Sequence, residues 1–303
     1  MLPSGEQIEI NFEDQRAVVT EVGATLRTYY KGAVAVVEGF TPHEIPDACR
    51  NQVCFPWVNR VGSGEWTYSG RFARAGADNV VTNTLNHGIV RWRPFRVDLA
   101  APDRCTLSYV LHPLPEYPFV TSFTVDYALG VDGLTVTSSV TNLDDVAVPF
   151  SLGYHPYFAV TTPSIEGATL HVPAASYLKV DQRMLPTGEV AAVAGTTLDF
   201  RSPKLVDGIE LDVTFTDLVR DGAGMFTATL IDANGHEVRV SQDASFPFFQ
   251  AFSGDTLAPG RRRTSLALEP MTAPAEALRS GQALIGLAPG ERWTGVWRVA
   301  RTA

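Results

Sequence analysis

The sequence predicts an all-β protein built as a large antiparallel β-sandwich. Three observations support this fold class: short segments alternate apolar and polar residues with a period of two, turn-forming residues bound nearly every segment, and helical periodicity is scarce along the 303 residues. Many short strands with few helices bury their apolar faces best as stacked sheets. We expect one domain spanning residues 1–303, because no stretch has the composition of a linker.

The alternating segments occur along the whole chain. In chain order the clearest are ATLRTYYKG at 24–32, RFARAG at 71–76, CTLSYVLH at 105–112, FTVDYALG at 123–130, LTVTSSVTN at 134–142, ATLHVP at 168–173 and EVRVSQD at 237–243. Hairpin turns are predicted at 131–133 and 233–235, where glycine supplies the positive φ angle that tight turns need. The best helix candidate is PAEALRSG at 274–281.

The charge of the chain argues against a nucleic-acid partner. The net charge is −9, whereas nucleic-acid binding needs a clustered basic surface that displaces counterions. The one basic run comprises residues 261–263, all arginine, and follows the Pro259-Gly260 turn. We expect this run to be an exposed loop tip.

Compartment signals in the sequence point to the cytoplasm. The first residues, MLPSGEQIEI, lack the pattern of a signal peptide, and no window approaches the 18 or so apolar residues of a membrane span. Cys49, Cys54 and Cys105 form neither a CxxC pair nor a metal-ligand spacing. An odd number of such cysteines is typical of free thiols in a reducing compartment.

Two segments in the first third of the chain carry polar residues that a core does not explain. In FPWVNRVGSG, Arg60 has a planar fork of donors that suits vicinal hydroxyls or a carboxylate, or else it extends to the surface. In LNHGIVRWRPF, His87 precedes Gly88, whose backbone can turn sharply or approach a ligand closely, although a structural histidine is the commoner case. Trp92 either stacks on a sugar or fills the core.

Two later segments raise the same question. In SLGYHPYF, His155 lies among aromatic residues, and Pro156 indicates a strand end or edge that frees the imidazole to face a cleft; a buried structural histidine is the alternative. In SLALEPMTAP, an apolar strand-like run ends in Glu269, whose carboxylate is costly to bury unless it is paired or used, or else it turns into solvent. Asp212, in ELDVTFTDL, is by itself typical of an exposed sheet face.

Five motifs in a fixed order carry a family resemblance: NRVGSG, LNHGIVRW, GYHPYF, LDVTFTDL and ALEPMTAP. Together they resemble the aldose 1-epimerase family, also called galactose mutarotases. Each motif is weak alone, but five in the correct order are specific, and the resemblance extends from about Asn51 to the C-terminal PGERWTGVWRV. It implies a single large β-sandwich that binds a sugar in an open cleft on one sheet.

The resemblance also implies roles for individual residues. The catalytic acid of the family falls on His155, and the catalytic base falls on Glu269. It implies that four further side chains bind the substrate or line the same cleft: Arg60, His87, Asp212 and Tyr157.

The chemistry fits these residue types. Interconverting the α and β anomers of a hexopyranose such as glucose or galactose requires a base that takes the C1 hydroxyl proton and an acid that protonates the ring oxygen. Each positioned proton transfer contributes roughly 10²–10⁴ in rate, so neither a metal nor an organic cofactor is required. An imidazole with a pKa of about 6.5 suits the acid. We expect Glu269 to be ionised at rest, helped by a neighbouring histidine or arginine.

The sequence leaves the substrate open. Ala159 and Val160 follow GYHPYF where galactose mutarotases more often have Asn and Leu, and the HPYF and EPMT spellings look like divergent bacterial branches, which include enzymes for sugar phosphates and sulfosugars. A hexose 6-phosphate or sulfosugar is therefore the alternative substrate, and it would need cationic donors. Candidate donors are Arg71, Arg74, Arg91, Arg93 and the run at 261–263.

Other classes of protein fit the sequence less well. A non-catalytic carbohydrate-binding protein has no need of an acid and base pair. A glycoside hydrolase usually uses two carboxylates, and only Glu269 stands out. The expected partner is a small sugar, and the expected assembly is a monomer or a homodimer.

Overall fold

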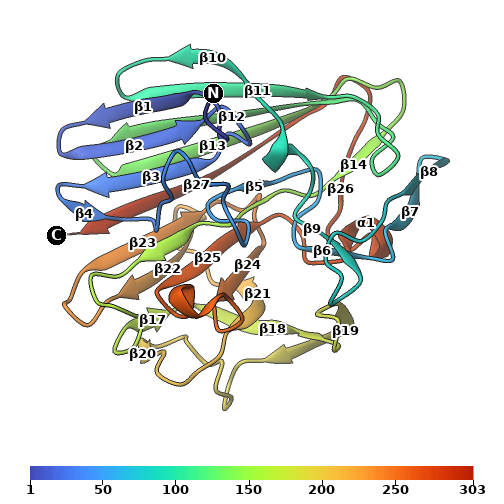
Figure 1. Ribbon diagram of the computed structural model, residues 1–303. Coiled ribbons are helices and arrows are strands. Elements are labelled where there is room, and N and C mark those ends of the chain that lie inside the picture. The colour runs from blue at the N-terminus through green and yellow to red at the C-terminus, as the bar shows by residue number, and fades with distance from the viewer. Residues whose placement is uncertain (303) are drawn as a thin grey trace.

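A computed structural model describes residues 1–302, which form mainly strands arranged in two large sheets and several small ones (Figure 1). The larger sheet has nine strands, and every neighbouring pair is antiparallel. Its spatial order is β10 (Arg96–Ala100), β11 (Arg104–Leu111), β12 (Thr121–Gly130), β13 (Gly133–Asn142), β27 (Arg292–Thr302), β23 (Glu237–Gln242), β22 (Phe226–Ile231), β17 (Thr169–His171) and β20 (Lys204–Leu205).

The second large sheet has eight strands. Its order is β19 (Pro186–Ala192), β18 (Ala174–Val180), β21 (Asp212–Leu218), β24 (Phe248–Phe252), β25 (Ser265–Met271), β15 (Gly153–Tyr154) and β5 (Val53–Cys54), with β16 (Tyr157–Ala159) also paired to β25. Figure 1 shows that neighbours in space are often far apart in sequence, since the C-terminal strand β27 lies between β13 and β23.

The remaining strands form one four-stranded sheet and three two-stranded ones. They are β1 (Gln7–Phe12), β2 (Gln15–Thr20), β3 (Leu26–Lys31) and β4 (Val34–Ala35), then β14 (Val148–Phe150) with β26 (Ile285–Leu287), β6 (Arg60–Gly62) with β9 (Thr84–Asn86), and β7 (Glu65–Tyr68) with β8 (Arg71–Arg74). Helical turns are few: α1 (Ala277–Ser280) and two 3₁₀ turns, η1 (Val90–Trp92) and η2 (Pro259–Arg261).

The core lies between the two large sheets. Phe226 of β22 packs against Phe249 of β24 with ring centroids 4.9 Å apart, and Trp297 of β27 packs against Tyr154 of β15 at 5.0 Å. Each pair joins one sheet to the other, and all four side chains are buried. Apolar faces of two antiparallel sheets therefore close on each other, which confirms the predicted β-sandwich.

The two predicted hairpins form where expected. The turn at 131–132 joins β12 to β13, and Gly133 has a φ of 100°; a Cβ atom there would lie 2.2 Å from the carbonyl oxygen of Val299. The turn from β22 to β23 contains Gly235, and the carboxylate of Asp232 accepts hydrogen bonds from the backbone of Asn234 and His236. Glycine is thus required at residue 133 by both the backbone angle and the neighbouring strand.

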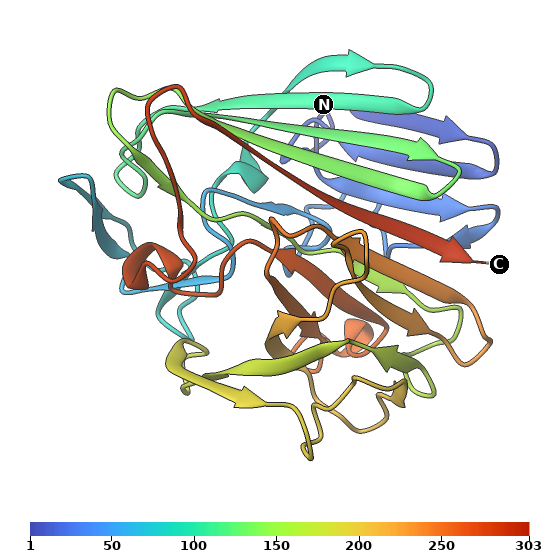
Figure 2. The ribbon, with the colours of Figure 1, turned by 180° about the vertical axis from the view of Figure 1, so that it is seen from behind.

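The predicted helix at 274–281 is shorter than expected. Helix α1 covers Ala277–Ser280, because Glu276 before it and Gly281 after it both have left-handed backbone angles. Figure 2 shows α1 beside the β7–β8 hairpin, and α1 contacts β7 and β6. Among residues 1–302 no helix has both the length and the apolar character needed to cross a bilayer.

A test of the core uses Phe123 of β12, which is fully buried and stacks on Phe55 with centroids 4.9 Å apart. We expect Phe123→Ala to lower the free energy of unfolding by about 3–5 kcal/mol, because it removes ring contacts and leaves a cavity. Denaturant unfolding measures the loss. Phe72→Ala is the matched control, since Phe72 is 59% exposed; equal losses in the two variants would contradict this account of the core.

Candidate active site

Three neighbouring strands of the eight-stranded sheet place polar groups on one face. In β24 and β25, Phe249 and Leu268 point into the core between the sheets. Because side chains alternate along a strand, the next residues face the other way. Gln250 and Glu269 follow these core residues, and Asp212 begins β21 one position before a core valine. The strand period thus gathers three polar side chains on the outer face.

Gln250 links these strands by hydrogen bonds. It is the cross-strand partner of Thr214 on β21 and of Glu269 on β25. Its Oε1 atom accepts from Thr214 Oγ1 at 2.5 Å, and its Nε2 atom donates to Asp212 Oδ1 at 2.5 Å. Sequence reasoning missed Gln250, although a lone amide among the phenylalanines of FFQAF was the available signal.

His155 and Glu269 lie opposite each other across the next pair of strands. On this side of β25, Gly153 pairs with Met271 and Tyr157 pairs with Ala267. Counting two residues inward from either pair brings His155 opposite Glu269. Directly opposed residues in antiparallel strands have neighbouring side chains on one face, so the backbone register itself brings the imidazole to the carboxyl group.

The expected break at Pro156 is present. Strand β15 ends at Tyr154 and β16 begins at Tyr157, so the ladder with β25 is interrupted. The backbone N–H of His155 donates to Gln52 O at 3.1 Å, and its carbonyl accepts from Asn51 N at 3.0 Å. The segment at residues 51–52 therefore satisfies the backbone of His155 where the sheet does not.

A separate two-stranded ladder positions Arg60 and His87. Arg60 of β6 pairs with Asn86 of β9, and His87 follows directly, its N–H donating to Asn59 O at 2.8 Å. Gly88 turns the chain with a φ of 70°, and a Cβ atom there would meet Phe55 O at 2.2 Å. The close approach at this glycine is therefore to the protein's own backbone and not to a ligand.

All six residues singled out in the sequence line one cleft of about 620 Å³. They are Arg60, His87, His155, Tyr157, Asp212 and Glu269. This volume lies in the range of small-molecule binding sites. Segments that are as much as 209 positions apart, from Arg60 to Glu269, meet at this one surface.

The imidazole of His155 and the carboxyl of Glu269 form a close, buried pair. Nε2 of His155 lies 3.3 Å from Oε1 of Glu269, and the two side chains are only 8% and 2% exposed. Within residues 1–302, the buried atoms His155 Nδ1 and Glu269 Oε2 have no hydrogen-bond partner. Unpaired polar atoms beside a cleft are groups that a bound polar ligand can satisfy.

Burial controls the protonation of this pair. It lowers the pKa of His155 to about 3 and raises the pKa of Glu269 well above its usual value; Asp212 adds to the rise, and the positive charge of Arg60 only partly opposes it. Both shifts favour a neutral imidazole and a protonated carboxyl, which is the opposite direction from the expectation that neighbouring groups hold Glu269 ionised at rest. A neutral pair nevertheless holds as many protons as a carboxylate with an imidazolium.

Arg60 and Asp212 contact each other at the wall of the cleft. Arg60 Nη2 lies 3.6 Å from Asp212 Oδ2, and Arg60 Nη1 donates to Asn59 Oδ1 at 3.1 Å. Burial raises the pKa of Asp212, while Arg60 and the hydrogen bond from Gln250 favour its ionised form. The isolated-residue expectation of an exposed sheet-face aspartate is not met, because Asp212 is held in place from two sides.

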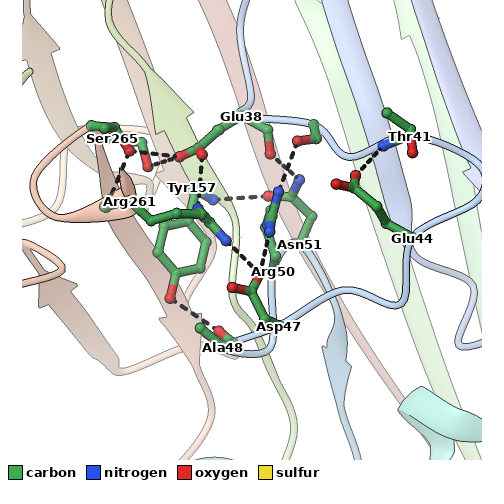
Figure 3. Close-up of polar contacts among 12 residues, drawn as sticks. Glu38, Thr41, Glu44, Asp47, Ala48, Arg50, Asn51, Tyr157, Arg261 and Ser265 are labelled. Carbon is green, nitrogen blue, oxygen red and sulfur yellow. Dashed lines mark hydrogen bonds and ion pairs between the residues drawn. The ribbon is translucent and has the colours of Figure 1, made fainter. Parts of the chain in front are cut away.

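Tyr157 supports the ring of His155. The two rings stack with centroids 4.9 Å apart and an interplanar angle of 15°. Figure 3 shows that Tyr157 is itself held by hydrogen bonds, with its hydroxyl donating to Ala48 O at 3.0 Å and its N–H donating to Asn51 Oδ1 at 2.9 Å. The Tyr157 side chain is buried, so its hydroxyl is committed to the backbone.

The arginine run is not an exposed loop tip. Arg261 pairs with Glu38 at 3.0 Å and with Asp47 at 2.5 Å (Figure 3), and Arg263 pairs with Glu166 at 2.6 Å. Both arginine side chains are only 15% exposed. The prediction failed because these acids lie far away in the sequence, and of the three arginines only Arg262 is exposed.

Among the arginines considered as donors for an anionic sugar, only Arg91 lines the cleft. It pairs with Asp78 at 3.1 Å, and its guanidinium lies 5.1 Å from the ring of Trp92. Arg71 instead pairs with Asp144. Trp92 is 47% exposed at the cleft, so it does not fill the core.

Glu269→Gln tests the cost of burying the carboxyl. The folded-state pKa of Glu269 lies above its unfolded value of about 4.3, so as pH rises the unfolded chain loses this proton first and stability falls between the two values. A glutamine has no such proton. We expect the variant to match the wild type in unfolding free energy near pH 4 and to exceed it at pH 8, by up to about 1.4 kcal/mol for each pH unit between the two pKa values.

The matched control is Glu9→Gln, because Glu9 is exposed on β1. Denaturant titrations of the three proteins at both pH values measure the difference. A gap between Glu269→Gln and wild type that is the same at pH 4 and pH 8 would mean that the carboxyl is not desolvated as the geometry indicates.

Comparisons with known proteins agree with this architecture. The family model "Aldose 1-epimerase" matches residues 6–300. The "Uncharacterized protein YihR" of Escherichia coli K12 is 28% identical over 289 residues, which is 95% of this chain and 91% of that protein. The galactose mutarotase of Sus scrofa is 28% identical over 225 residues, 67% of this chain and 63% of that protein. The crystal structure of the GalM/aldose epimerase homologue from C. elegans superposes with a TM-score of 0.87 at 19% identity and 98% coverage of both chains. The match to the family model over nearly the whole chain means that this protein belongs to the aldose 1-epimerase family.

Proposed function

We propose that this protein is an aldose 1-epimerase that interconverts the α and β anomers of a neutral hexopyranose such as glucose or galactose. The observation that carries the proposal is the buried pair of His155 and Glu269, which lie 3.3 Å apart and line a cleft of about 620 Å³. Ring opening needs one group that accepts a proton and one that donates a proton, both within reach of C1 and the ring oxygen. The pair offers these two groups side by side.

The reaction begins when the sugar lies over this pair. Glu269, as carboxylate, takes the proton of the C1 hydroxyl while His155, as imidazolium, gives a proton to the ring oxygen, and the bond from C1 to that oxygen breaks. The open-chain aldehyde rotates about C1–C2. Reclosure on the other face reverses both transfers, which returns each proton to its starting group.

Sugar binding can generate the charged form of the pair without solvent. The empty site favours the neutral form, and the ion pair differs from it only by moving one proton from the carboxyl to the imidazole. Hydroxyls of the bound sugar would supply hydrogen bonds to the unpaired atoms Glu269 Oε2 and His155 Nδ1. Hydrogen bonds to the charged forms stabilise them, so the substrate itself favours the reactive state.

The other cleft residues orient the sugar in this proposal. Arg60 has a buried Nε atom with no partner within residues 1–302, and it can donate to a ring hydroxyl. His87 approaches His155 edge to face, with ring centroids 5.1 Å apart, so its imidazole reaches the same part of the cleft. Asp212, held by Arg60 and Gln250, accepts a hydrogen bond from another hydroxyl of the sugar.

The geometry favours this reaction over glycoside hydrolysis. That chemistry usually needs two carboxyl groups that act together, one as acid and one as base or nucleophile. Asp212 is the other carboxylate near Glu269, and Arg60 and Gln250 engage both of its oxygens. The group that lies opposite Glu269 is an imidazole, which suits reversible proton exchange.

Replacing either member of the pair tests the proposal. We expect His155→Asn and Glu269→Gln each to lower the rate of anomer interconversion by roughly 10²–10⁴, because each removes one positioned proton transfer. Polarimetry of freshly dissolved α-glucose and α-galactose measures the approach to equilibrium, and NMR exchange spectroscopy measures interconversion at equilibrium.

The exposed variant Glu9→Gln should keep the wild-type rate and serves as the control. If His155→Asn and Glu269→Gln both kept the wild-type rate, the assignment of His155 as acid and Glu269 as base would be wrong. A wild-type protein that binds these sugars in calorimetry without accelerating interconversion would instead be a carbohydrate-binding protein.

A second substrate class is favoured by one observation. Arg91 lines the cleft with a side chain that is only 13% exposed, and its Nε atom has no partner among the residues described. A phosphate or sulfonate at C6 of a hexose would accept hydrogen bonds from this guanidinium.

A panel of anomerically pure sugars separates the two classes: glucose, galactose, glucose 6-phosphate and the 6-sulfonate of glucose. We expect a neutral hexose to have the highest kcat/KM and Arg91→Gln to change it little. Preference for an anionic sugar, with a loss of about 10- to 150-fold in Arg91→Gln from a missing charged hydrogen bond, would reverse the assignment. Arg93→Gln is the neighbouring control, because Arg93 does not line the cleft.

A further inference from the structure

Two thiols and an imidazole lie close together against one wall of the cleft. The proposed acid and base chemistry uses none of the three. The Sγ atom of Cys54 is 3.7 Å from Sγ of Cys49 and 3.5 Å from Nδ1 of His87. All three atoms lie within 4.8 Å of one another. Thiolate sulfur and imidazole nitrogen are the ligands that zinc prefers in proteins.

The fold brings these three groups together although their spacing in the sequence is irregular. Phe55 and Gly88 form a parallel bridge, so the residues before them, Cys54 and His87, lie side by side. Cys54 also pairs with Gly153 on the neighbouring strand β15. Gly153 precedes His155 by two residues, so Cys54 lies near His155 in the same sheet. A ligand from β5 and a ligand after β9 thus meet beside the cleft.

Cys49 is fixed in place by a strained and heavily bonded segment. Ala48, Cys49 and Asn51 have φ angles of 49°, 56° and 57°, which non-glycine residues rarely adopt. Figure 3 shows the contacts that hold this segment: Ala48 O accepts from the Tyr157 hydroxyl, and Asn51 Nδ2 donates to Glu38 O at 2.9 Å. Strained residues persist where the surrounding structure over-determines them, often at functional sites.

The two separations that Cys54 makes fit a tetrahedral zinc ion, and Cys49 Sγ and His87 Nδ1 lie within 4.8 Å of each other. Zinc–sulfur bonds of about 2.3 Å and zinc–nitrogen bonds of about 2.0–2.1 Å at tetrahedral angles place two sulfurs about 3.8 Å apart and a sulfur and a nitrogen about 3.5 Å apart. The two observed distances are 3.7 Å and 3.5 Å. We propose that Cys49, Cys54 and His87 form a Zn²⁺ site whose fourth position opens to the sugar cleft, and that zinc bound there inhibits sugar turnover.

The inhibition follows from where the ligands lie, and that part of the proposal rests on the proposed function. Cys49 and His87 both line the cleft, so a fourth ligand on zinc, water or a sugar hydroxyl, would stand inside it. Zinc would also hold His87 by Nδ1 and fix the ring that we expect to contact the sugar. The proposed reaction itself needs no metal.

Binding is a simple exchange of protons for metal. Each cysteine thiol releases its proton to solvent as its sulfur becomes a thiolate ligand, while the histidine binds as a neutral imidazole. The two thiolate charges balance the charge of Zn²⁺. No oxidant or reductant takes part.

Direct metal binding tests the site independently of any sugar activity. The full-length protein is reduced with a phosphine, freed of metal with a chelator and titrated anaerobically with Co²⁺. We expect one Co²⁺ per chain, with thiolate-to-metal charge-transfer absorption and the visible bands of tetrahedral cobalt, and displacement of both by Zn²⁺. Wild-type protein without the charge-transfer absorption would overturn the site.

Variants locate the bound metal. We expect Cys49→Ser and Cys54→Ser each to weaken Co²⁺ binding by more than about 10- to 100-fold, since disturbing even the supporting contacts of a ligand costs that much. Cys105→Ser is the matched control, because Cys105 is an equally buried thiol on β11, outside the cluster. His87→Gln provides an independent ligand removal should a cysteine variant fold poorly. Charge-transfer absorption that survives in these variants would place the metal elsewhere and overturn the proposal.

A second measurement tests inhibition. Each protein's rate of anomer interconversion with Zn²⁺ is divided by its own rate without Zn²⁺, and we expect a chelator-reversible fall for wild type and Cys105→Ser but not for Cys54→Ser. Tight Co²⁺ binding with an unchanged rate ratio would overturn the proposed inhibition, while the proposed metal site would stand. Absence of any interconversion in zinc-free wild type would count against the proposed function alone, since the cobalt spectrum still decides whether the site exists.

Discussion

Each residue of β25 must face either the core between the sheets or the cleft, and the rest of the site depends on that constraint. Leu266 and Leu268 point inward and pack between the sheets, which fixes Glu269 on the outer face. The register with β24 then places Gln250 on one side of Glu269, and the register with β15 and β16 places His155 on the other. A register shift of one residue would move every side chain of β25 to the other face of the sheet. Core packing and site geometry therefore cannot vary independently.

Much of the fold was predictable because its signals are local. The period of two and the turn residues mark strands such as β12 and β13 directly. The helix expected at 274–281 is reduced mainly at its start, where Glu276 has a left-handed backbone angle that composition does not reveal. The six site residues were found mainly by the family resemblance. Asp212, for example, resembled an ordinary exposed aspartate by its own segment, and only the resemblance assigned it to the site; the fold then sets it against Arg60.

What could not be predicted depends on contacts between distant segments. Gln250 belongs to the site because of two strand registers, and no pattern within FFQAF defines its partners. Cys49 and Cys54 do not have the sequence spacing of metal ligands. His87, the third member of their cluster, is placed beside Cys54 by the β-bridge between Phe55 and Gly88. The position of Arg261 was predicted wrongly for the same reason, since its partner Glu38 lies in the distant segment that follows β4.

The pairing of His155 with Glu269 has a consequence for proton exchange between the protein and solvent. Both groups are shielded from solvent, and in the proposed reaction each returns to its starting protonation state when the sugar ring recloses. The two protons that move can therefore circulate between the pair and the sugar, and solvent need neither supply nor remove one during a turnover. In such a site protons pass only between the pair and the bound sugar, which links the donor to the acceptor. The surrounding apolar sheet keeps water away from the transfer.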